Sequence, residues 1–402
     1  MPDDVSGGGV PEYPRPGVYV EVLRPEAARV PALTRSRLHI GRVERAGRTS
    51  RRWPAETTAA LFIGFARVGP FGEPTAIRSW AEFDETFGGL VEGMWLGYAV
   101  YGFFANGGTL CHVVREDDLH DLSFSADLER WMDTSDVAVV CAPDLAGAQH
   151  AGRISAETTT AYLLWMATLC EYTGQAVAIV DTPPEATPQQ AKDWRFSVGS
   201  VDSPAVAVYH PWLVVEDPVT MRRVPMPPSG HLAGVYANND AVRGFHYAPS
   251  NEVVLNAEDV AYRTGVDEQQ FLAMAGINSL VFSPGRGVVV WGARSASSEP
   301  EWRYLRRRRL LSFITRRIRA QTTWVVGERA DLGRVRQNAA LDIGDLLHLL
   351  WLSGAVWGDS PEDAYSVSLD EDAADATRFT IECVVAAERD LSLCFRVVYV
   401  CE

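Results

Sequence analysis

The chain contains 402 residues, of which 47% are hydrophobic, and its formal net charge at pH 7 is −15. This composition fits two or three packed domains and excludes a largely disordered chain. The negative net charge excludes a general nucleic-acid binder, because phosphate contacts need clustered lysine and arginine.

The first predicted element is a strand within an N-terminal arm, residues 1–24. Three valines at every second position, Val18, Val20 and Val22, share one face, which is the pattern of a half-buried strand. No neighbouring segment of the sequence offers this strand a partner. An arginine-rich stretch at about residues 29–54 follows with little periodicity, and it is typical of a solvated basic insertion.

The segment after this insertion alternates between strands and helices. Short apolar runs rich in β-formers predict buried strands at 60–66, 109–115, 136–144, 176–183 and 205–215. Helices are predicted between them, at 79–89, 96–108 and 161–174. This spacing of strand and helix units predicts a mixed α/β fold with a mainly parallel sheet.

A second α/β unit is predicted from residue 273. Its elements are a strand at 287–294, a long helix from Glu301 to about Ala320, a strand at 323–326, an apolar helix at 346–358 and a strand at 379–387. We therefore place an N-terminal domain at 25–272, a C-terminal domain at 273–390 and a C-terminal arm strand at 391–402. In this last strand one face carries Leu391, Leu393, Phe395, Val397 and Tyr399, and it is a second strand without an evident partner.

The long helix combines an apolar stripe with many arginines. A helical wheel places Arg308, Arg309, Arg316 and Arg319 away from the stripe, so we expect them to form a basic surface that either binds an acidic partner or is simply solvated. The same wheel places Arg303 and Arg307 on the apolar side, where each charge needs a carboxylate or carbonyl partner.

Signatures of catalysis are missing from the sequence. None of the standard nucleotide-binding, zinc-protease or nucleophile motifs occurs at a strand-to-helix junction, and we predict no catalytic residues, no cofactor and no metal site. Asp144 and Asp181 end two predicted strands of the sheet, where an α/β enzyme would bind its ligand. We favour a structural interpretation, in which both carboxylates cap turns or the helices that follow them.

The remaining sequence signals concern compartment. Six cysteines lie in apolar segments without a C-x-x-C pair, so they are predicted to be small core residues. No apolar run is long enough to cross a bilayer, and no signal peptide is evident. We expect assembly in the cytoplasm and no direct membrane insertion.

Taken together, these segments resemble the tail sheath proteins of contractile phages and of phage-derived contractile injection systems. The resemblance spans most of the chain and rests on the order and spacing of several motifs, none of which is decisive alone. These motifs are PGVYVEV (16–22), FIGFARVGPFGEP (62–74), GYAVYGFFANGGTLCHVVR (97–115), VPMPPSGHLAGVYANNDAVRGFHYAPSNE (224–252) and GINSLVFSPGRGVVVWGARS (276–295).

The resemblance implies a structural function without catalysis. Sheath subunits polymerise around an inner tube, and their contraction drives the tube through a target envelope. The implied partners are further copies of the chain, an inner tube protein, and baseplate and cap proteins. Charge complementarity to an acidic tube is our hypothesis for Arg308, Arg309, Arg316 and Arg319.

The resemblance also implies that both arms add strands to a small sheet in neighbouring subunits. The residues predicted to join subunits are Val18, Tyr19, Val20, Val22, Leu393, Phe395, Val397 and Tyr399. Two alternatives remain at this stage: a sheath-like baseplate or cap component, and an α/β enzyme with a site near Asp144 and Asp181.

Overall fold

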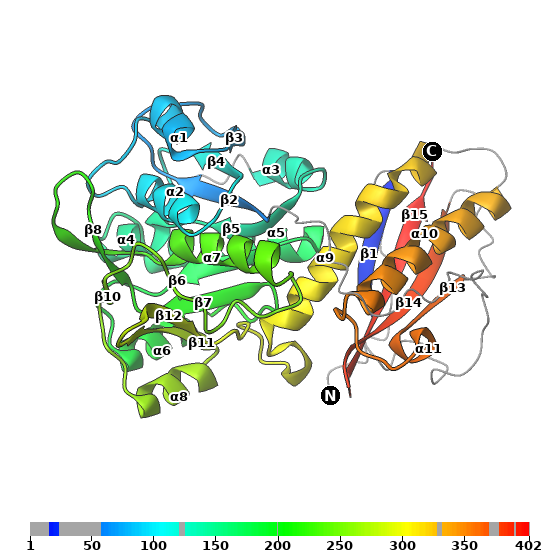
Figure 1. Ribbon diagram of the computed structural model, residues 1–402. Helices are drawn as coiled ribbons and strands as arrows, with labels where there is room; N and C mark the ends of the chain where they lie inside the picture. The colour runs from blue at the N-terminus through cyan, green and yellow to red at the C-terminus, as the bar shows by residue number, and fades with distance from the viewer. Residues whose placement is uncertain are drawn as a thin grey trace, which may run out of the picture. The chain divides into compact units, whose positions relative to one another are not determined.

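The computed structural model describes residues 16–23, 58–119, 125–198, 200–327, 332–369, 378–389 and 391–401. The predicted arginine-rich insertion at about 29–54 therefore lies outside the described part. The chain forms two compact units, a larger unit at 52–316 and a smaller unit that combines 1–51 with 317–402 (Figure 1). Both contain helices and sheets, which confirms the predicted mixed α/β class.

The larger unit is built on an eight-stranded sheet in which the inner strands run parallel. The antiparallel strands β3 and β12 form its two edges. In spatial order the strands are β12 (Gly287–Trp291), β11 (Ile277–Ser283), β7 (Val206–His210), β6 (Val177–Asp181), β5 (Val137–Cys141), β2 (Ala59–Gly64), β4 (Cys111–Arg115) and β3 (Thr75–Ile77).

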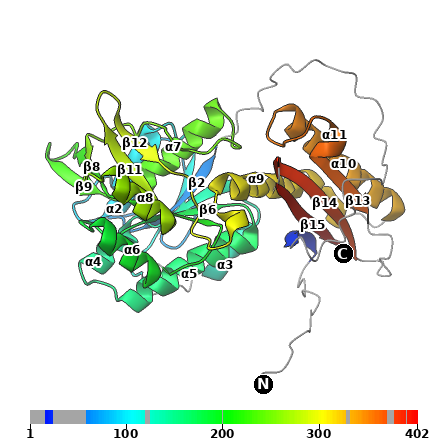
Figure 2. The ribbon, with the colours of Figure 1, turned by 90° about the horizontal axis from the view of Figure 1, so that it is seen from below.

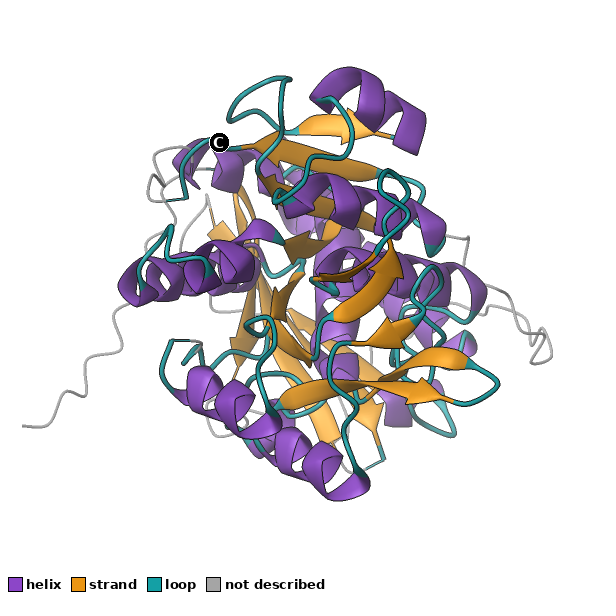
Figure 3. Cartoon of the chain, turned by 90° about the vertical axis from the view of Figure 1, so that its left-hand side faces the viewer, coloured by secondary structure: helices purple, strands orange, loops and turns teal. Residues whose placement is uncertain are grey.

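Helices cover both faces of this sheet (Figure 3). Along β2, Ala60 and Phe62 face one hydrophobic core while Leu61 and Ile63 face the other, so this strand is apolar at every position. The first core includes residues of α1 (Trp80–Phe87), α2 (Trp95–Ala105) and α7 (Ser229–Val242). The second includes residues of α3 (Ser125–Met132), α4 (Asp144–His150), α5 (Ala156–Thr173), α6 (Pro188–Phe196) and α8 (Val266–Met274).

Helices α2 and α7 approach each other closely through glycine. A Cβ atom at Gly230 would lie 2.3 Å from the Cα of Ala99, and one at Gly102 would lie 2.3 Å from the ring of His231. Only glycine fits at such separations, so these two positions fix the distance between the helices.

A small antiparallel sheet of order β10-β8-β9 also belongs to the larger unit. It contains β8 (Leu213–Glu216), β9 (Arg223–Met226) and the two-residue strand β10 (Asp259–Val260). Strands β8 and β9 form a hairpin whose loop spans residues 217–222. Figure 2 shows this hairpin at the edge of the larger unit.

The smaller unit contains a four-stranded antiparallel sheet of order β1-β15-β14-β13. Its strands are β1 (Gly17–Leu23), β15 (Leu391–Val400), β14 (Arg378–Glu388) and β13 (Tyr365–Leu369). Helix α10 (Leu332–Leu352) packs on β13 and β14, next to the short helix α11 (Pro361–Ala364). All six cysteines of the chain are buried, as predicted for small core residues.

The predicted domain boundary between residues 272 and 273 is wrong. Strand β11 pairs in parallel with β7, and β12 extends the same sheet, so both belong to the larger unit. The division instead falls within α9 (Leu305–Thr322). The sequence did not reveal this because the pairing joins strands that are far apart along the chain.

Three predicted elements near α9 differ from the structure. The long helix begins at Leu305, after a separate 3-10 turn η1 (Pro300–Trp302). The strand predicted at 323–326 is a 3-10 helix, η2 (Thr323–Gly327). The apolar helix begins at Leu332 and ends at Leu352, near the glycine at position 354.

Candidate assembly site

The two strands predicted to lack partners pair with each other in the smaller unit. Strand β1 lies antiparallel to β15, with Val18 opposite Tyr399 and Val20 opposite Val397. The other edge of β15 pairs with β14 along nearly its whole length. The prediction that β1 and β15 are unpartnered within the chain is therefore wrong, although their period-2 faces do meet across the sheet.

Burial differs strongly between these two strands. Phe395, Val397 and Tyr399 are fully buried, and Cys394 and Val398 on the opposite face of β15 are buried as well. In β1, by contrast, Val18, Tyr19 and Val20 are half-buried and Val22 is exposed; on β15, Leu393 is buried. Strand β15 is thus a central strand, while β1 is an edge strand that covers it.

A row of charges crosses the sheet at one register position. Arg396 of β15 lies opposite Glu21 of β1 and opposite Glu382 of β14. Its Nη2 atom lies 2.6 Å from the Oε1 atom of Glu382. A shift of β1 by one residue would move Glu21 to the other face of the sheet, so this row favours the observed register.

The arginines of α9 do not form the exposed basic face that the helical wheel predicted. Arg308 and Arg309 are only 4% and 7% exposed, and Arg316 and Arg319 are half-buried. The prediction is wrong for Arg308 and Arg309, because a wheel cannot show which polar groups surround a helix. Contact of Arg316 and Arg319 with an inner tube stays a prediction.

Two of these arginines donate to carbonyl groups at and just beyond the C-terminal end of α5. The Nη2 atom of Arg308 donates to the carbonyl oxygen of Cys170 at 2.6 Å, and Nη1 of Arg316 donates to that of Gln175 at 2.5 Å. Carbonyl groups at a helix C-terminus carry partial negative charge, so the cation of Arg308 stabilises the end of α5.

The two arginines that the wheel placed on the apolar side differ from each other. Arg307 is half-buried and donates to the carbonyl oxygen of Glu301, whereas Arg303 is exposed.

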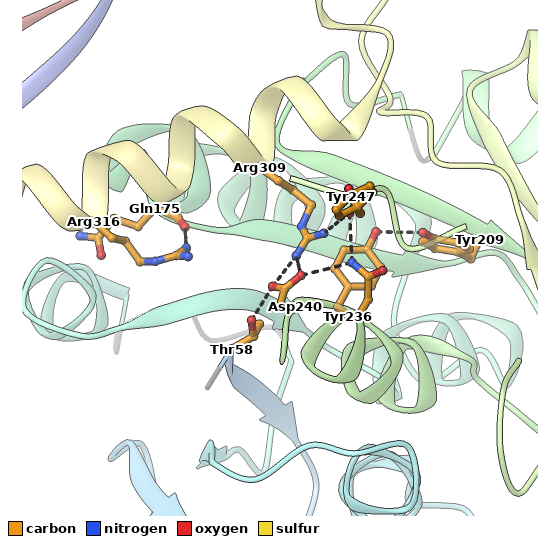
Figure 4. Close-up of polar contacts among 9 residues, drawn as sticks. Thr58, Gln175, Tyr209, Tyr236, Asp240, Tyr247, Arg309 and Arg316 are labelled. Atoms are coloured by element: carbon orange, nitrogen blue, oxygen red, sulfur yellow. Dashed lines mark hydrogen bonds and ion pairs between the residues drawn. The ribbon is translucent and has the colours of Figure 1, made fainter. Parts of the chain in front are cut away.

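Arg309 forms a buried ion pair with Asp240 of α7 (Figure 4). Its Nη2 atom lies 2.5 Å from Oδ1 of Asp240, and the two side chains are 7% and 5% exposed. Thr58, which immediately precedes β2, donates to Oδ2 of Asp240 at 2.5 Å. The guanidinium also donates to the carbonyl oxygen of Tyr247 at 3.3 Å and lies over the ring of Tyr236 at 4.8 Å from its centroid.

This ion pair joins three elements of the larger unit. It connects the first turns of α9 to α7 and to the start of β2, and Tyr236 in turn shares a hydrogen bond of 2.8 Å with Tyr209 of β7 (Figure 4). A buried charge without its partner would be costly, so the pair holds α9 in one place on the larger unit. The sequence showed the arginine but not the carboxylate, which lies 69 residues away.

Asp144 and Asp181 both cap helices, but not the helices that follow them. The carboxylate of Asp144 accepts hydrogen bonds from the backbone N–H of Trp95, the first residue of α2, and of Phe65 at 2.6 and 3.0 Å. That of Asp181 accepts from the N–H and hydroxyl of Ser229, the first residue of α7, at 2.8 and 2.6 Å. Both carboxylates thus cap helices, but the prediction that they cap local turns or the helices that follow them is wrong, because their partners are distant in sequence.

Both carboxyl groups are buried, and burial dominates their ionisation. Burial raises the pKa of Asp144 to about 6 and that of Asp181 to about 7, although their hydrogen bonds lower it in part. The folded chain therefore retains protons that the unfolded chain releases near pH 4. These two groups contribute stability at acidic pH that is lost as pH rises from about 4 through about 7.

We expect Asp181→Asn to gain stability relative to the wild type as pH rises across this range. The asparagine cannot ionise, so only the wild type loses the contribution, by on the order of a few kcal/mol. Urea unfolding of both proteins between pH 4 and pH 8 measures the difference. The buried histidines are the same in both proteins, so their contribution to the pH dependence of the unfolding free energy cancels in the comparison. A difference in unfolding free energy that is constant with pH would contradict the prediction.

Neither a metal site nor a membrane span is found in the part of the chain that the structure describes. That part contains no group of three or more histidine, cysteine, aspartate or glutamate side chains placed to bind a metal ion. Within it, too, every helix is too short or too polar to span a bilayer. The β1–β15 sheet and helix α9 are the features that the sequence linked to assembly.

Three comparisons relate the chain to known proteins. Residues 132–296 match the model of the phage tail sheath protein central domain. A prophage major tail sheath protein of Pseudomonas aeruginosa (strain UCBPP-PA14) is 26% identical over 156 residues, a match that spans 38% of this chain and 39% of that relative.

Solved structures are similar over most of the chain. The anti-feeding prophage (AFP) helical sheath in the contracted state has a TM-score of 0.68 and 25% identity, over 89% of this chain and 97% of that one. The PVC sheath of an extracellular contractile injection system, also contracted, has a TM-score of 0.66 and 23% identity, over 89% and 95%. Residues 132–296 are thus similar to the phage tail sheath central domain, and the fold of most of the chain is similar to that of contractile sheath proteins.

Proposed function

We propose that this chain is the structural sheath subunit of a contractile injection system or phage tail. Copies of it polymerise around an inner tube, and contraction of the polymer drives the tube through a target envelope. The observation that carries this proposal is the similarity to the AFP sheath, which extends over 89% of the chain and includes both of its compact units.

This role needs packing and linkage rather than a reaction. Asp144 and Asp181, the carboxylates that an enzyme would use, are occupied by helix N-termini. The partners are further copies of the chain, an inner tube protein, and baseplate and cap proteins. We expect assembly in the cytoplasm as part of a phage tail-like particle.

The edge strand β1 supports a mechanism for linkage between subunits. The backbone groups of β15 that bond β1 would bond the same strand from a neighbouring copy equally well, so exchange changes few contacts. Residues 24–57 separate β1 from the first residue of the larger unit that is described, and this length of chain could reach roughly 110 Å if extended. The predicted joining residues of β1 would then contact those of β15 in another subunit.

Electron microscopy of the purified protein tests the proposed function directly. We expect tubes or stacked rings formed by this chain alone or on added inner tubes. A chain that remains monomeric at all concentrations and on tubes would contradict the proposal. A chain found in few copies at one end of a particle would instead be a baseplate or cap component.

One added cysteine, Leu23→Cys, reports whether β1 pairs with β15 of its own subunit or of a neighbouring one. Leu23 lies opposite Cys394 in the register of β1 and β15, and directly opposed positions fit the Cα separation of a disulfide. We expect Leu23→Cys to form a disulfide within one chain in monomers and between chains in the polymer. Non-reducing gels would show covalent ladders from oxidised polymer only, and Leu23→Ser is the matched control.

The opposite result would also be clear. If oxidised Leu23→Cys polymer ran as monomer with its disulfide formed, β1 would remain in its own subunit. Linkage between subunits would then require other surfaces.

A further inference from the structure

Two small features of the larger unit carry its most exposed apolar side chains. Among the described residues, the five large hydrophobic side chains with the greatest exposure are Met274 (79%), Val266 (78%), Met221 (69%), Val219 (67%) and Phe196 (61%). Val219 and Met221 lie in the loop of the β8–β9 hairpin, which we name the hairpin tip. The other three lie on α6 and α8, which we name the helix platform. Exposed apolar groups gathered in this way mark interaction surfaces.

The hairpin tip is held in one conformation by Asp217. The backbone N–H of Val219 and the hydroxyl of Thr220 donate to this carboxylate at 2.9 and 2.7 Å, and the N–H of Met221 donates to its carbonyl oxygen at 2.8 Å. Met221 has a φ of 54°, which is uncommon for a residue with a side chain. The loop thus holds two apolar side chains outward at little further cost in conformational entropy on binding.

Packing contacts also hold the helix platform in place. Lys192 of α6 lies over the ring of Phe271 of α8, with Nζ 4.3 Å from the ring centroid. Beneath them Trp194 and Leu272 are buried in the core of the larger unit. Helices α6 and α8 pack against each other, and their ends carry the exposed side chains of Phe196, Val266 and Met274.

The charges around the two features are complementary. Arg222 and Arg223 follow the apolar residues of the hairpin tip and are exposed, and the guanidinium of Arg223 also pairs with Glu258 of the same chain. Asp193 and Asp267 lie beside the apolar residues of the platform and are also exposed. Figure 1 shows the hairpin and the α6–α8 pair apart from each other, so one copy cannot place its own tip on its own platform.

We propose that the hairpin tip of one subunit docks on the helix platform of a second copy of this chain. A contact between two different surfaces of identical chains is heterologous, and it generates an open helical assembly unless the ring closes. This inference rests on the proposed sheath function. It adds a direct contact between the larger units of two copies to the linkage that strand exchange provides. Opposite charges at the rim would select the register of docking.

Cross-linking between two variants that each gain one cysteine tests the contact. The native cysteines of the chain are all buried, so background disulfides should be rare. We expect polymer made from a mixture of Val219→Cys and Phe196→Cys chains to yield oxidised dimers that contain one chain of each kind. Tyr172→Cys, at a position of α5 that is 57% exposed, replaces Phe196→Cys in the control mixture and should yield at least about tenfold less dimer.

Charge reversal supplies an independent measurement. We expect Arg222→Glu to raise the protein concentration needed for assembly at least about tenfold, and Asp193→Arg with Asp267→Arg to do the same. The three substitutions together should restore assembly, because the rim charges are again opposite. Thermal unfolding of each monomer checks that the variants fold.

The outcomes separate this inference from the proposed function. If the chains with one added cysteine polymerise normally but do not form the mixed disulfide, the docking contact is overturned and the sheath function still stands. A wild-type chain that never polymerises overturns both. A disulfide that appears only with added tube protein, and that contains it, assigns the tip to another partner and overturns the proposal.

Discussion

A chain that lacks residues 1–24 is expected to fold as a monomer and to lose the ability to polymerise. The deletion removes β1, whose half-buried valines cover one edge of β15. The larger unit should fold unchanged, because its two hydrophobic cores contain no residue of β1. The smaller unit keeps β13, β14, β15 and α10, so we expect its stability to fall without loss of its fold.

Three measurements check this expectation together. Circular dichroism reports folding, sedimentation velocity reports the oligomeric state, and electron microscopy reports sheath formation. The matched control deletes residues 1–12 and leaves Gly17–Leu23 intact, so it should still polymerise. Normal sheaths from the chain that lacks residues 1–24 would show that β1 does not link subunits.

Removal of the Asp240 carboxylate is expected to destabilise the larger unit more than any other single side-chain change considered above. In Asp240→Ala the guanidinium of Arg309 stays buried, and the carbonyl oxygen of Tyr247 is the hydrogen-bond acceptor that it keeps. The hydroxyl of Thr58 loses its acceptor. An uncompensated buried charge of this kind costs about 3–5 kcal/mol. The start of α9 should loosen from α7 at the same time.

Urea unfolding followed by tryptophan fluorescence measures this effect, and the transition of the larger unit is the relevant one. Asp259→Ala is the matched control, because Asp259 pairs with the exposed Arg263 at the surface and should matter little. A double variant, Asp240→Leu with Arg309→Met, should recover much of the loss because it leaves no unpaired charge. Equal effects of Asp240→Ala and Asp259→Ala would contradict the role of the buried pair.

These two experiments separate linkage from rigidity. Deletion of β1 should abolish polymerisation while the larger unit keeps its stability. Asp240→Ala should instead weaken the larger unit and the attachment of α9, which continues into the smaller unit. A sheath that contracts needs both a link that persists and bodies that move as units, and the chain places these properties in different residues.

The sequence predicted the inner strands β2, β4, β5, β6 and β7 because these strands are buried on both faces, whereas it did not predict β3 or β11. Runs such as 136–144 and 176–183 are apolar at successive positions, and β5 and β6 form within them. The interval between these runs also indicated the helices that cover the sheet. It did not indicate where the unit ends, because the pairing of β11 with β7 depends on residues that are distant along the chain.

The candidate site was only partly visible in the sequence. Period-2 valines identified β1, yet nothing local indicated that β15 would lie beside it. The helical wheel identified the apolar stripe of α9 but predicted that Arg308 and Arg309 would be exposed, whereas both are buried. The carbonyl of Cys170 and the carboxylate of Asp240 make those buried positions favourable, and both lie far from α9 in sequence.

By itself, the sequence determined the class of fold, the period of each main strand and the family resemblance, because these depend on the local order of apolar and polar residues. The tertiary structure alone decided which strands pair, which charges are buried and which apolar side chains remain exposed. Each of these depends on groups brought together from distant parts of the chain. A buried arginine or an edge strand is stable only beside its particular partner, and local periodicity carries no information about that partner.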